Sequence, residues 1–139
     1  MNPPGIATML LDPGRTPGPE MYRFMISAVV PRPIAFVSTR SADGAANLAP
    51  FSYFNALSSI PPLVGIAIVD RPGDEKDTLR NIRDTGEFVV NLVCERMLPA
   101  MVRTAGDWPR DTSEFEIAGL TPSTSERAPD VSRDCSPRM

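Results

Sequence analysis

Residues 47–62 read NLAPFSYFNALSSIPP, a stretch in which strand-forming aromatic and apolar residues are interrupted by small polar residues and prolines. Before it, the segment 34–39, IAFVST, alternates its side chains between two faces and predicts a strand. Asp43 and Gly44 lie between the two segments, and this pair is typical of a β-hairpin turn because glycine accepts a positive φ. The stretch is therefore predicted to be the second arm of a hairpin that runs out towards Ala56.

The other elements are predicted from hydrophobic spacing and from the residues that end each run. The helix beginning near Asp77 has the clearest signals, with Asp77 as N-cap, Leu79 and Ile82 on one face, and Gly86 as the stop. The segment 63–69, LVGIAIV, is apolar on both faces and predicts a fully buried strand. Further helices are expected at 20–30 and 95–106, and further strand-like segments at 87–93 and 114–120. Together these elements favour a mainly antiparallel barrel or sheet with short helices.

The composition excludes several classes of function. The chain has 139 residues, of which 42% are hydrophobic and 22% charged, as expected of one domain with one modest core. A net charge of -3 argues against binding to nucleic acid or to an anionic membrane, and no apolar run is long enough to span a bilayer. There is no histidine, which excludes Ser–His–Asp and Cys–His catalysis and argues against a metal centre. If the chain is an enzyme, a bound cofactor is expected to carry the chemistry, with no catalytic side chain assigned.

The cysteines and the N-terminus bear on the cellular compartment. Cys94 and Cys135 have no metal-ligand spacing, and residues 1–19 form a Pro- and Gly-rich arm without a charged leader and apolar core. These features predict a cytoplasmic protein. Neither GxGxxG nor a P-loop is present, so Rossmann and Walker-type nucleotide binding have no support.

Small polar residues at the ends of the predicted hairpin arms suggest a ligand site. Ser38 and Thr39 end one arm, and Ser52 and Asn55 lie on the other. Such side chains allow the close approach of a flat heteroaromatic ligand and supply hydrogen-bond donors to it. The alternative is a sheet edge whose polar residues bond to the local backbone.

A second candidate site lies where the clearest helix begins. Lys76, the only lysine, and Thr78 stand beside this predicted N-terminus, where a phosphate is favoured. Asp77 as N-cap would compete with a phosphate for the same N–H groups, and the alternative is an ordinary solvated helix start. Elsewhere, Asn91 is expected to face a turn or cavity, and Trp108 either covers a pocket or anchors its loop.

Four ordered blocks of sequence resemble the flavin reductase-like family with the FMN-binding split barrel. They are VVPRPIAFVST (29–39), DGAANLAPFSYFNALSSIPPLV (43–64), KDTLRNIRDTGEFVVNLV (76–93) and EFEIAGLTPS (114–123). The resemblance covers about residues 20–125 and implies a six-stranded antiparallel Greek-key barrel with short helices. It also implies an FMN cofactor, NAD(P)H as reductant, a homodimer with flavin near its interface, and a partner monooxygenase or other electron acceptor.

The resemblance also implies roles for individual residues. Ser38 and Thr39 are expected near the ribityl–phosphate part of the flavin, the strand 49–55 along the isoalloxazine edge, and Lys76 and Thr78 at the phosphate. The complete set of expected cofactor-binding residues is Ser38, Thr39, Ala49, Ser52, Tyr53, Phe54, Asn55, Lys76 and Thr78.

Residues 126–139 depart from the family pattern and are interpreted as an atypical tail that leaves the barrel incomplete at its C-terminus. Three functions follow as alternatives. The first is an NAD(P)H-dependent flavin reductase that transfers hydride from nicotinamide to FMN. The others are a non-catalytic FMN-binding or electron-carrier module and an inactive truncated fragment.

Overall fold

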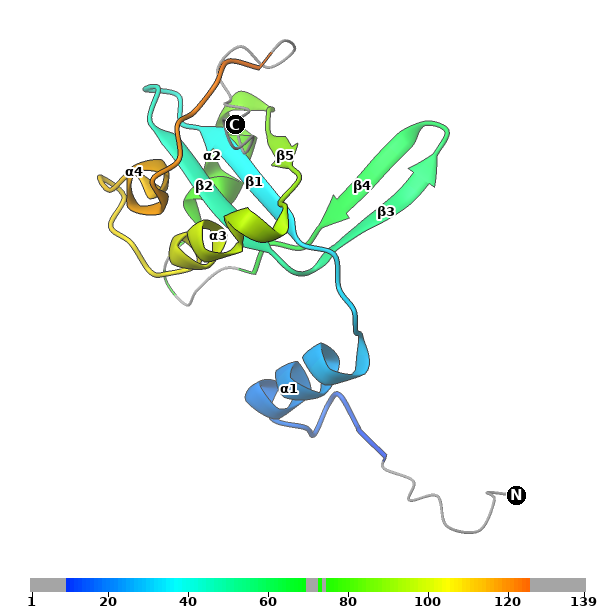
Figure 1. Cartoon of the computed structure of the whole chain (residues 1–139). Coiled ribbons are helices and arrows are strands. Elements are labelled where there is room, and N and C mark those ends of the chain that lie inside the picture. Colours follow the sequence, from blue (N-terminus) through cyan, green and yellow to red (C-terminus); the bar gives the residue numbers. More distant parts are fainter. Residues whose placement is uncertain (1–9, 70–72, 74, 126–139) are drawn as a thin grey trace. The chain divides into compact units, whose positions relative to one another are not determined.

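The computed structural model describes residues 10–69, 73 and 75–125, which form two compact units (Figure 1). The first unit extends to Arg32 and the second begins at Pro33. In the first unit, helix α1 spans Gly18–Ala28 and buries none of its residues. Its position agrees with the predicted helix at 20–30, and Pro19 lies in its first turn, where the missing backbone N–H of proline is tolerated.

A three-stranded antiparallel sheet forms the centre of the second unit, with strand order β2-β1-β5. The strands are β1 (Ala35–Arg40), β2 (Ala46–Phe51) and β5 (Val89–Asn91). The predicted turn between β1 and β2 is confirmed, because Gly44 has a φ of 94° and its N–H bonds to the carbonyl of Ser41. The register pairs Val37 with Ala49 on one side and with Val90 on the other, so β1 is the central strand.

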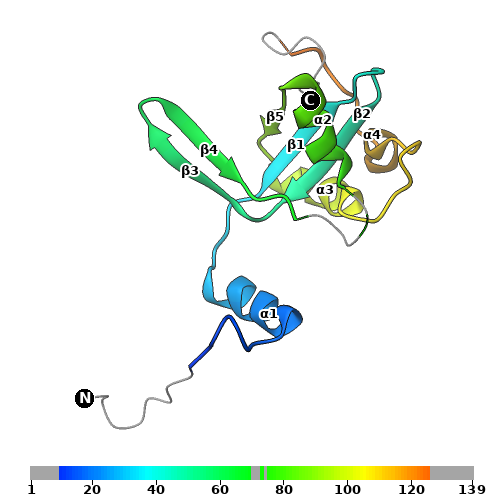
Figure 2. The ribbon, with the colours of Figure 1, turned by 180° about the vertical axis from the view of Figure 1, so that it is seen from behind.

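Both faces of the sheet are covered, which explains why β1 is buried along nearly its whole length. Helices α3 (Leu98–Thr104) and α4 (Glu114–Ala118) cover one face (Figure 1). Phe36 and Leu48 of the sheet pack there against Met101 and Phe115. Helix α2 (Asp77–Thr85) lies across the other face, as Figure 2 shows from behind.

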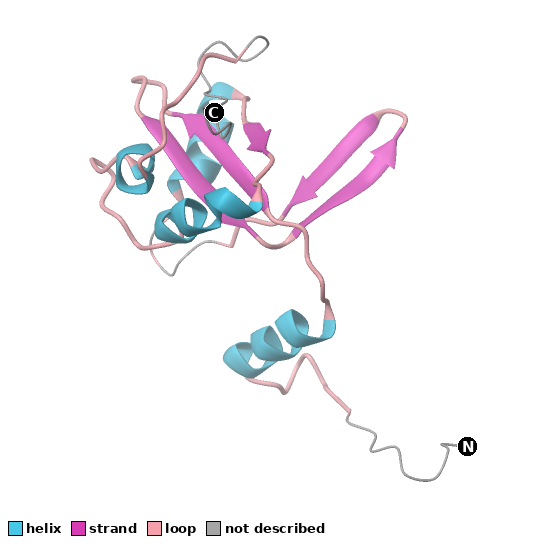
Figure 3. Cartoon of the chain, in the orientation of Figure 1, coloured by secondary structure: helices cyan, strands magenta, loops and turns pink. Residues whose placement is uncertain are grey.

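The opening stretch divides between two sheets, so the prediction of one strand running to Ala56 is wrong. Strand β2 ends at Phe51, and a separate strand, β3 (Phe54–Ser59), pairs with β4 (Pro62–Ile66) in a hairpin of its own (Figure 3). The base of this hairpin is anchored, since Phe54 and Ile66 pack against the core cluster that contains Phe51.

The segment 63–69 is also not the fully buried strand that its composition predicts. Leu63 and Val64 on β4 are 51% and 47% exposed. Among the described residues, β4 pairs only with β3, and the hairpin extends away from the sheet in Figures 1 and 2. An apolar sequence therefore lies in solvent here because no other described element covers it.

The helices show two further differences from the predictions. Lys76, and not Asp77, is the N-cap residue of α2, although Gly86 ends this helix in the left-handed conformation as expected. Residues 114–118 form helix α4 and not a strand; Phe115 and Ala118, three positions apart, are both buried. The predicted helix after residue 94 is confirmed as a short 3₁₀ turn, η1 (Glu95–Met97), followed by α3.

Candidate functional site

A cavity of about 410 Å³ lies between β2, the first turn of α2 and the segment that follows α3. Its walls combine small and apolar groups of β2 with polar and charged groups of α2. Its lining includes Asn47, Ala49, Lys76, Thr78, Trp108 and Glu114.

The first turn of α2 supplies the cationic part of the cavity wall. Lys76 is the N-cap residue, and its backbone is extended. No side chain forms a capping hydrogen bond with the N–H groups of this helix end. The Lys76 ammonium lies 5.9 Å from the centre of the Phe51 ring, within the range of a cation–π contact. An uncapped helix N-terminus beside a lysine is a favourable place for an anionic group.

The acidic residues around this turn are paired with arginines. The Asp77 carboxylate lies 3.1 Å from the Arg80 guanidinium and 2.9 Å from that of Arg110. Glu75 likewise forms ion pairs with Arg80 and Arg83. The expected competition between an Asp77 cap and a phosphate is therefore absent, because the Asp77 side chain binds arginines in place of the helix end.

A buried polar cluster connects the sheet to α2. The Asn47 side-chain amide donates to the hydroxyl of Thr39 at 3.2 Å and to that of Thr78 at 2.9 Å. Asn81, one turn further along α2, donates to the Thr39 hydroxyl at 3.0 Å. All four side chains are buried, so the face of α2 that meets the sheet is polar. Leu79 and Ile82, which were expected to form its buried face, are only partly buried.

Sequence reasoning missed Asn47, which lines the cavity, and Asn81, which lies behind it in the polar cluster. Thr78 and Asn81 are three positions apart on a helix and so share a face, and Asn47 lies opposite Thr39 in the hairpin register. These spacings could have identified the cluster. The buried face was instead assigned to the hydrophobic residues Leu79 and Ile82, each of which directly follows one of these polar residues.

Ser38 is separated from this cluster by the sheet itself. Neighbouring residues of a strand point to opposite faces, so Ser38 and Thr39 lie on different sides. The Ser38 hydroxyl is completely buried and accepts a 3.0 Å hydrogen bond from the side chain of Asn91, which also donates to the carbonyl of Phe36. Asn91 is thus buried against β1, in contrast to its expected place facing a turn or cavity.

The remaining predicted residues are spread along the junction of the two sheets. Ala49 lines the cavity together with Lys76 and Thr78. Ser52 and Tyr53 join β2 to β3 and are partly buried, as is Phe54, whereas Asn55 on β3 is exposed. The structure therefore brings Ala49, Lys76 and Thr78 together at one cavity. Thr39 lies behind the cavity and is linked to it by its hydrogen bond with Asn47.

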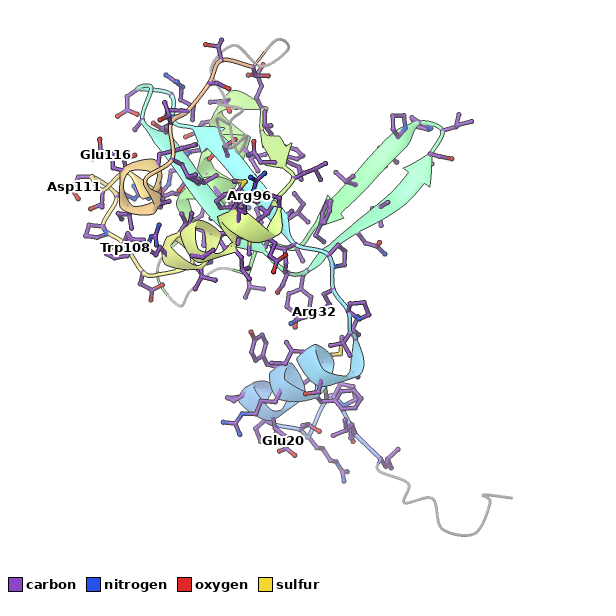
Figure 4. All side chains as sticks on the ribbon, in the orientation of Figure 1. Glu20, Arg32, Arg96, Trp108, Asp111 and Glu116 are labelled. Carbon is purple, nitrogen blue, oxygen red and sulfur yellow. The ribbon has the colours of Figure 1, made fainter. Side chains whose placement is uncertain are left out.

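Trp108 both borders the cavity and anchors its loop. Figure 4 shows this residue in the segment between α3 and α4. Its indole N–H donates to the carbonyl of Arg103 at 3.0 Å, and 43% of its surface is exposed. A Cβ atom on Gly106 would come within 2.9 Å of the indole nitrogen, so the glycine permits this close approach.

Glu114, in the cavity wall, has a shifted pKa. Burial raises the pKa of Glu114 above its usual value, and the negative charge of Asp77 acts in the same direction. The backbone N–H of Leu48 donates to the carboxylate at 3.3 Å and opposes this shift only in part.

The described residues include no group of three or more residues suited to holding a metal ion. They also include no helix long and apolar enough to cross a membrane.

Comparison with known proteins identifies relatives that are longer than this chain. The model of the flavin reductase like domain matches residues 26–138, which extends beyond the sequence blocks described above. A protein of Aquifex aeolicus is 46% identical over 112 residues, which are 80% of this chain and 57% of the relative. Protein BH2278 of Halalkalibacterium halodurans is 47% identical over 119 residues, or 85% of this chain and 57% of the relative. The chain thus spans little more than half the length of these relatives.

Solved structures agree with the match to the flavin reductase like domain. Nitrilotriacetate monooxygenase component B from Bacillus cereus has a TM-score of 0.85 and 36% identity, covering 91% of this chain and 62% of that one. The 2-nitrobenzoate 2-nitroreductase NbaA of Pseudomonas fluorescens has a TM-score of 0.78 and 36% identity, covering 90% of this chain and 59% of that one. A split-barrel protein of Shewanella frigidimarina has a TM-score of 0.73 and 25% identity, covering 91% of this chain and 63% of that one. The chain belongs to the flavin reductase-like family and has its split-barrel fold.

Proposed function

We propose that the chain binds FMN and acts as, or as part of, an NAD(P)H-dependent flavin reductase. The observation that carries this proposal is the uncapped N-terminus of α2, where Lys76 and Thr78 line the same cavity. The membership of the flavin reductase-like family implies a flavin, and FMN ends in a phosphate monoester that this arrangement suits.

The residues present fit such a ligand. Lys76 supplies a positive charge and Thr78 a hydroxyl for the phosphate. The acids on either side of Lys76 in the sequence, Glu75 and Asp77, are paired with arginines. The third acid of the cavity wall, Glu114, has a pKa raised by burial, which disfavours its negative charge. Ala49 on β2 presents a small side chain to the same cavity and allows close approach of a flat ring. We place the isoalloxazine ring along the segment from Ala49 to Asn55, so that the ring lies where the two sheets meet.

When bound, the flavin supplies the redox chemistry by accepting hydride from the nicotinamide. The chain's own residues bind the phosphate, fix the direction of the ring and limit its contact with water. As a reductase, the chain would supply reducing equivalents to a monooxygenase or another acceptor. The similarity to a monooxygenase component from Bacillus cereus supports this role. We place the flavin near the interface of a homodimer, as the family resemblance implies.

The test compares FMN with riboflavin, which lacks the phosphate. Lys76→Ala should weaken FMN binding by about 1.5–3 kcal/mol, the range for hydrogen bonds to charged groups, and should change riboflavin binding little. Lys76→Arg retains the charge and should keep most of the preference for FMN. Equal losses for both ligands in a fluorescence titration would mean that Lys76 acts through folding, and the phosphate assignment would fail.

Oxidation of NADH and NADPH with added FMN tests the catalytic part of the proposal. FMN binding without oxidation of NADH or NADPH would contradict the reductase activity and would support the alternative, a non-catalytic FMN-binding or electron-carrier module. Tighter binding of FAD than of FMN would contradict the choice of cofactor.

A further inference from the structure

The buried polar cluster beneath the proposed phosphate site has a geometry that suggests a specific role. We infer that Asn47 is a positioning residue that orients the Thr78 hydroxyl so that its proton is donated to the phosphate of the ligand. This inference rests on the proposed function, because it names the residue that prepares the same site.

The contacts connect Asn47 to the site through Thr78. Asn47 and Thr78 both line the 410 Å³ cavity, and the Asn47 side-chain nitrogen lies 2.9 Å from the Thr78 hydroxyl oxygen. Thr78 is only 2% exposed, so its hydroxyl is held in a closely packed environment. The two residues are 31 positions apart in the chain and meet because α2 packs on the face of the sheet that carries Asn47.

The chemistry of a hydroxyl gives this contact a direction. A threonine hydroxyl has one proton and two lone pairs, whereas an amide N–H₂ group can only donate. The Thr78 oxygen therefore accepts from Asn47, and its single proton must be directed elsewhere. An ionised phosphate offers only acceptors and needs such donors. Asn47 thus favours the orientation of Thr78 that an anionic ligand requires.

Thr39 holds Asn47 in place in this arrangement. Its hydroxyl is 1% exposed and accepts from both Asn47 at 3.2 Å and Asn81 at 3.0 Å. Thr78 lines the cavity but Thr39 does not, so we assign Thr39 the role of supporting Asn47 from behind the site. Asn81 donates to Thr39, whereas the described hydrogen bond to the Thr78 hydroxyl comes from Asn47, so Asn81 is a matched control within the same cluster.

A double-mutant cycle on the full chain tests the inference, with the Kd of FMN and of riboflavin measured by flavin fluorescence. Thr78→Val removes the hydroxyl at nearly constant size and should weaken FMN by about tenfold while leaving riboflavin nearly unchanged. Asn47→Leu should also reduce the preference for FMN, by about three- to tenfold, since it releases the hydroxyl. In the Thr78→Val background, Asn47→Leu should cause no further loss of preference. Thr78→Ser retains the hydroxyl and should restore the preference.

The control and the contrary outcomes separate the inference from the proposed function. Asn81→Leu should lower the urea midpoint of unfolding but leave the ratio of the two Kd values unchanged. If Asn47→Leu does not fold, Asn47→Ser, which is too short to reach Thr78, takes its place in the cycle. Equal effects on FMN and riboflavin, or a full additional loss in the Thr78→Val background, would overturn the role of Asn47. An unsubstituted chain that binds both ligands equally would instead overturn the phosphate site itself.

Discussion

The net charge of -3 does not describe the surroundings of Lys76. Around the first turn of α2, the acids Glu75 and Asp77 face three arginines, Arg80, Arg83 and Arg110, within ion-pair distance. An acidic chain can therefore present an anion-binding site, because the charge within a few ångströms of a ligand matters more than the distant charges that solvent and salt screen.

Glu114 gives a prediction about pH. Because burial raises its pKa, the folded state binds its proton more tightly than the unfolded chain does. Its contribution to stability is complete at acidic pH and is lost as the pH rises through the folded-state pKa. Glu114→Gln, which stays neutral and still accepts from Leu48, should gain stability relative to the unsubstituted chain as the pH rises towards neutrality.

Urea unfolding from acidic to neutral pH measures this difference. Glu116→Gln is the matched control, since Glu116 is exposed on the same helix and is labelled in Figure 4. A constant difference between Glu114→Gln and the unsubstituted chain at every pH would contradict the assigned role of burial.

At the level of elements, α2 has an end determined by its own residues and a buried face determined by its neighbours. Gly86 ends the helix at a φ of 73°, and its N–H bonds to the carbonyl of Ile82 at 2.8 Å. The buried positions of the same helix, Thr78 and Asn81, are polar because they meet Asn47 and Thr39 of the sheet. The helix thus combines a local signal for its length with a tertiary reason for its orientation.

Gly86→Ala should destabilise the second unit by about 1–2 kcal/mol, the cost of a left-handed conformation for a residue with a Cβ atom. A Cβ at this position meets no atom within 4 Å, so the loss would come from the backbone and not from a clash. Gly86→Asn should lose less, because asparagine tolerates this conformation better. Chemical denaturation compares the three proteins, and equal stability of all three would show that the helix end does not depend on the positive φ.

At the scale of the whole molecule, the β3–β4 hairpin exposes apolar surface that the sheet core does not cover. Leu57, Ile60, Leu63 and Val64 are 66%, 91%, 51% and 47% exposed. Exposed apolar side chains gathered on one element are typical of a protein–protein contact. This surface is consistent with the proposed homodimer, in which the hairpin would be covered by a second copy.

Replacing Leu63 and Val64 together by threonine should therefore reduce self-association. Threonine keeps the strand propensity of the hairpin while it lowers the apolar area. Sedimentation velocity at several concentrations measures the change. Val102→Thr on α3, where Val102 is 60% exposed, is the control and should leave association unchanged. An unsubstituted chain that sediments as a monomer at all concentrations would contradict the prediction.

The sequence by itself determined the features that depend on neighbouring residues. Strand β1, the Gly44 turn and the end of α2 at Gly86 follow from side-chain alternation and from the freedom of glycine at positive φ. The lysine and threonine beside the start of α2 were likewise visible as a candidate phosphate site.

Only the tertiary structure decided which of these segments pack together. The stretch from Asn47 onward contains strand-forming residues throughout, but it leaves the first sheet after Phe51 and forms a second one. Leu63 and Val64 of the apolar segment are exposed, and the polar residues Asn47 and Thr78 meet in the interior. Burial depends on which distant segments cover a residue and not on its hydrophobicity alone, so local patterns could not determine it.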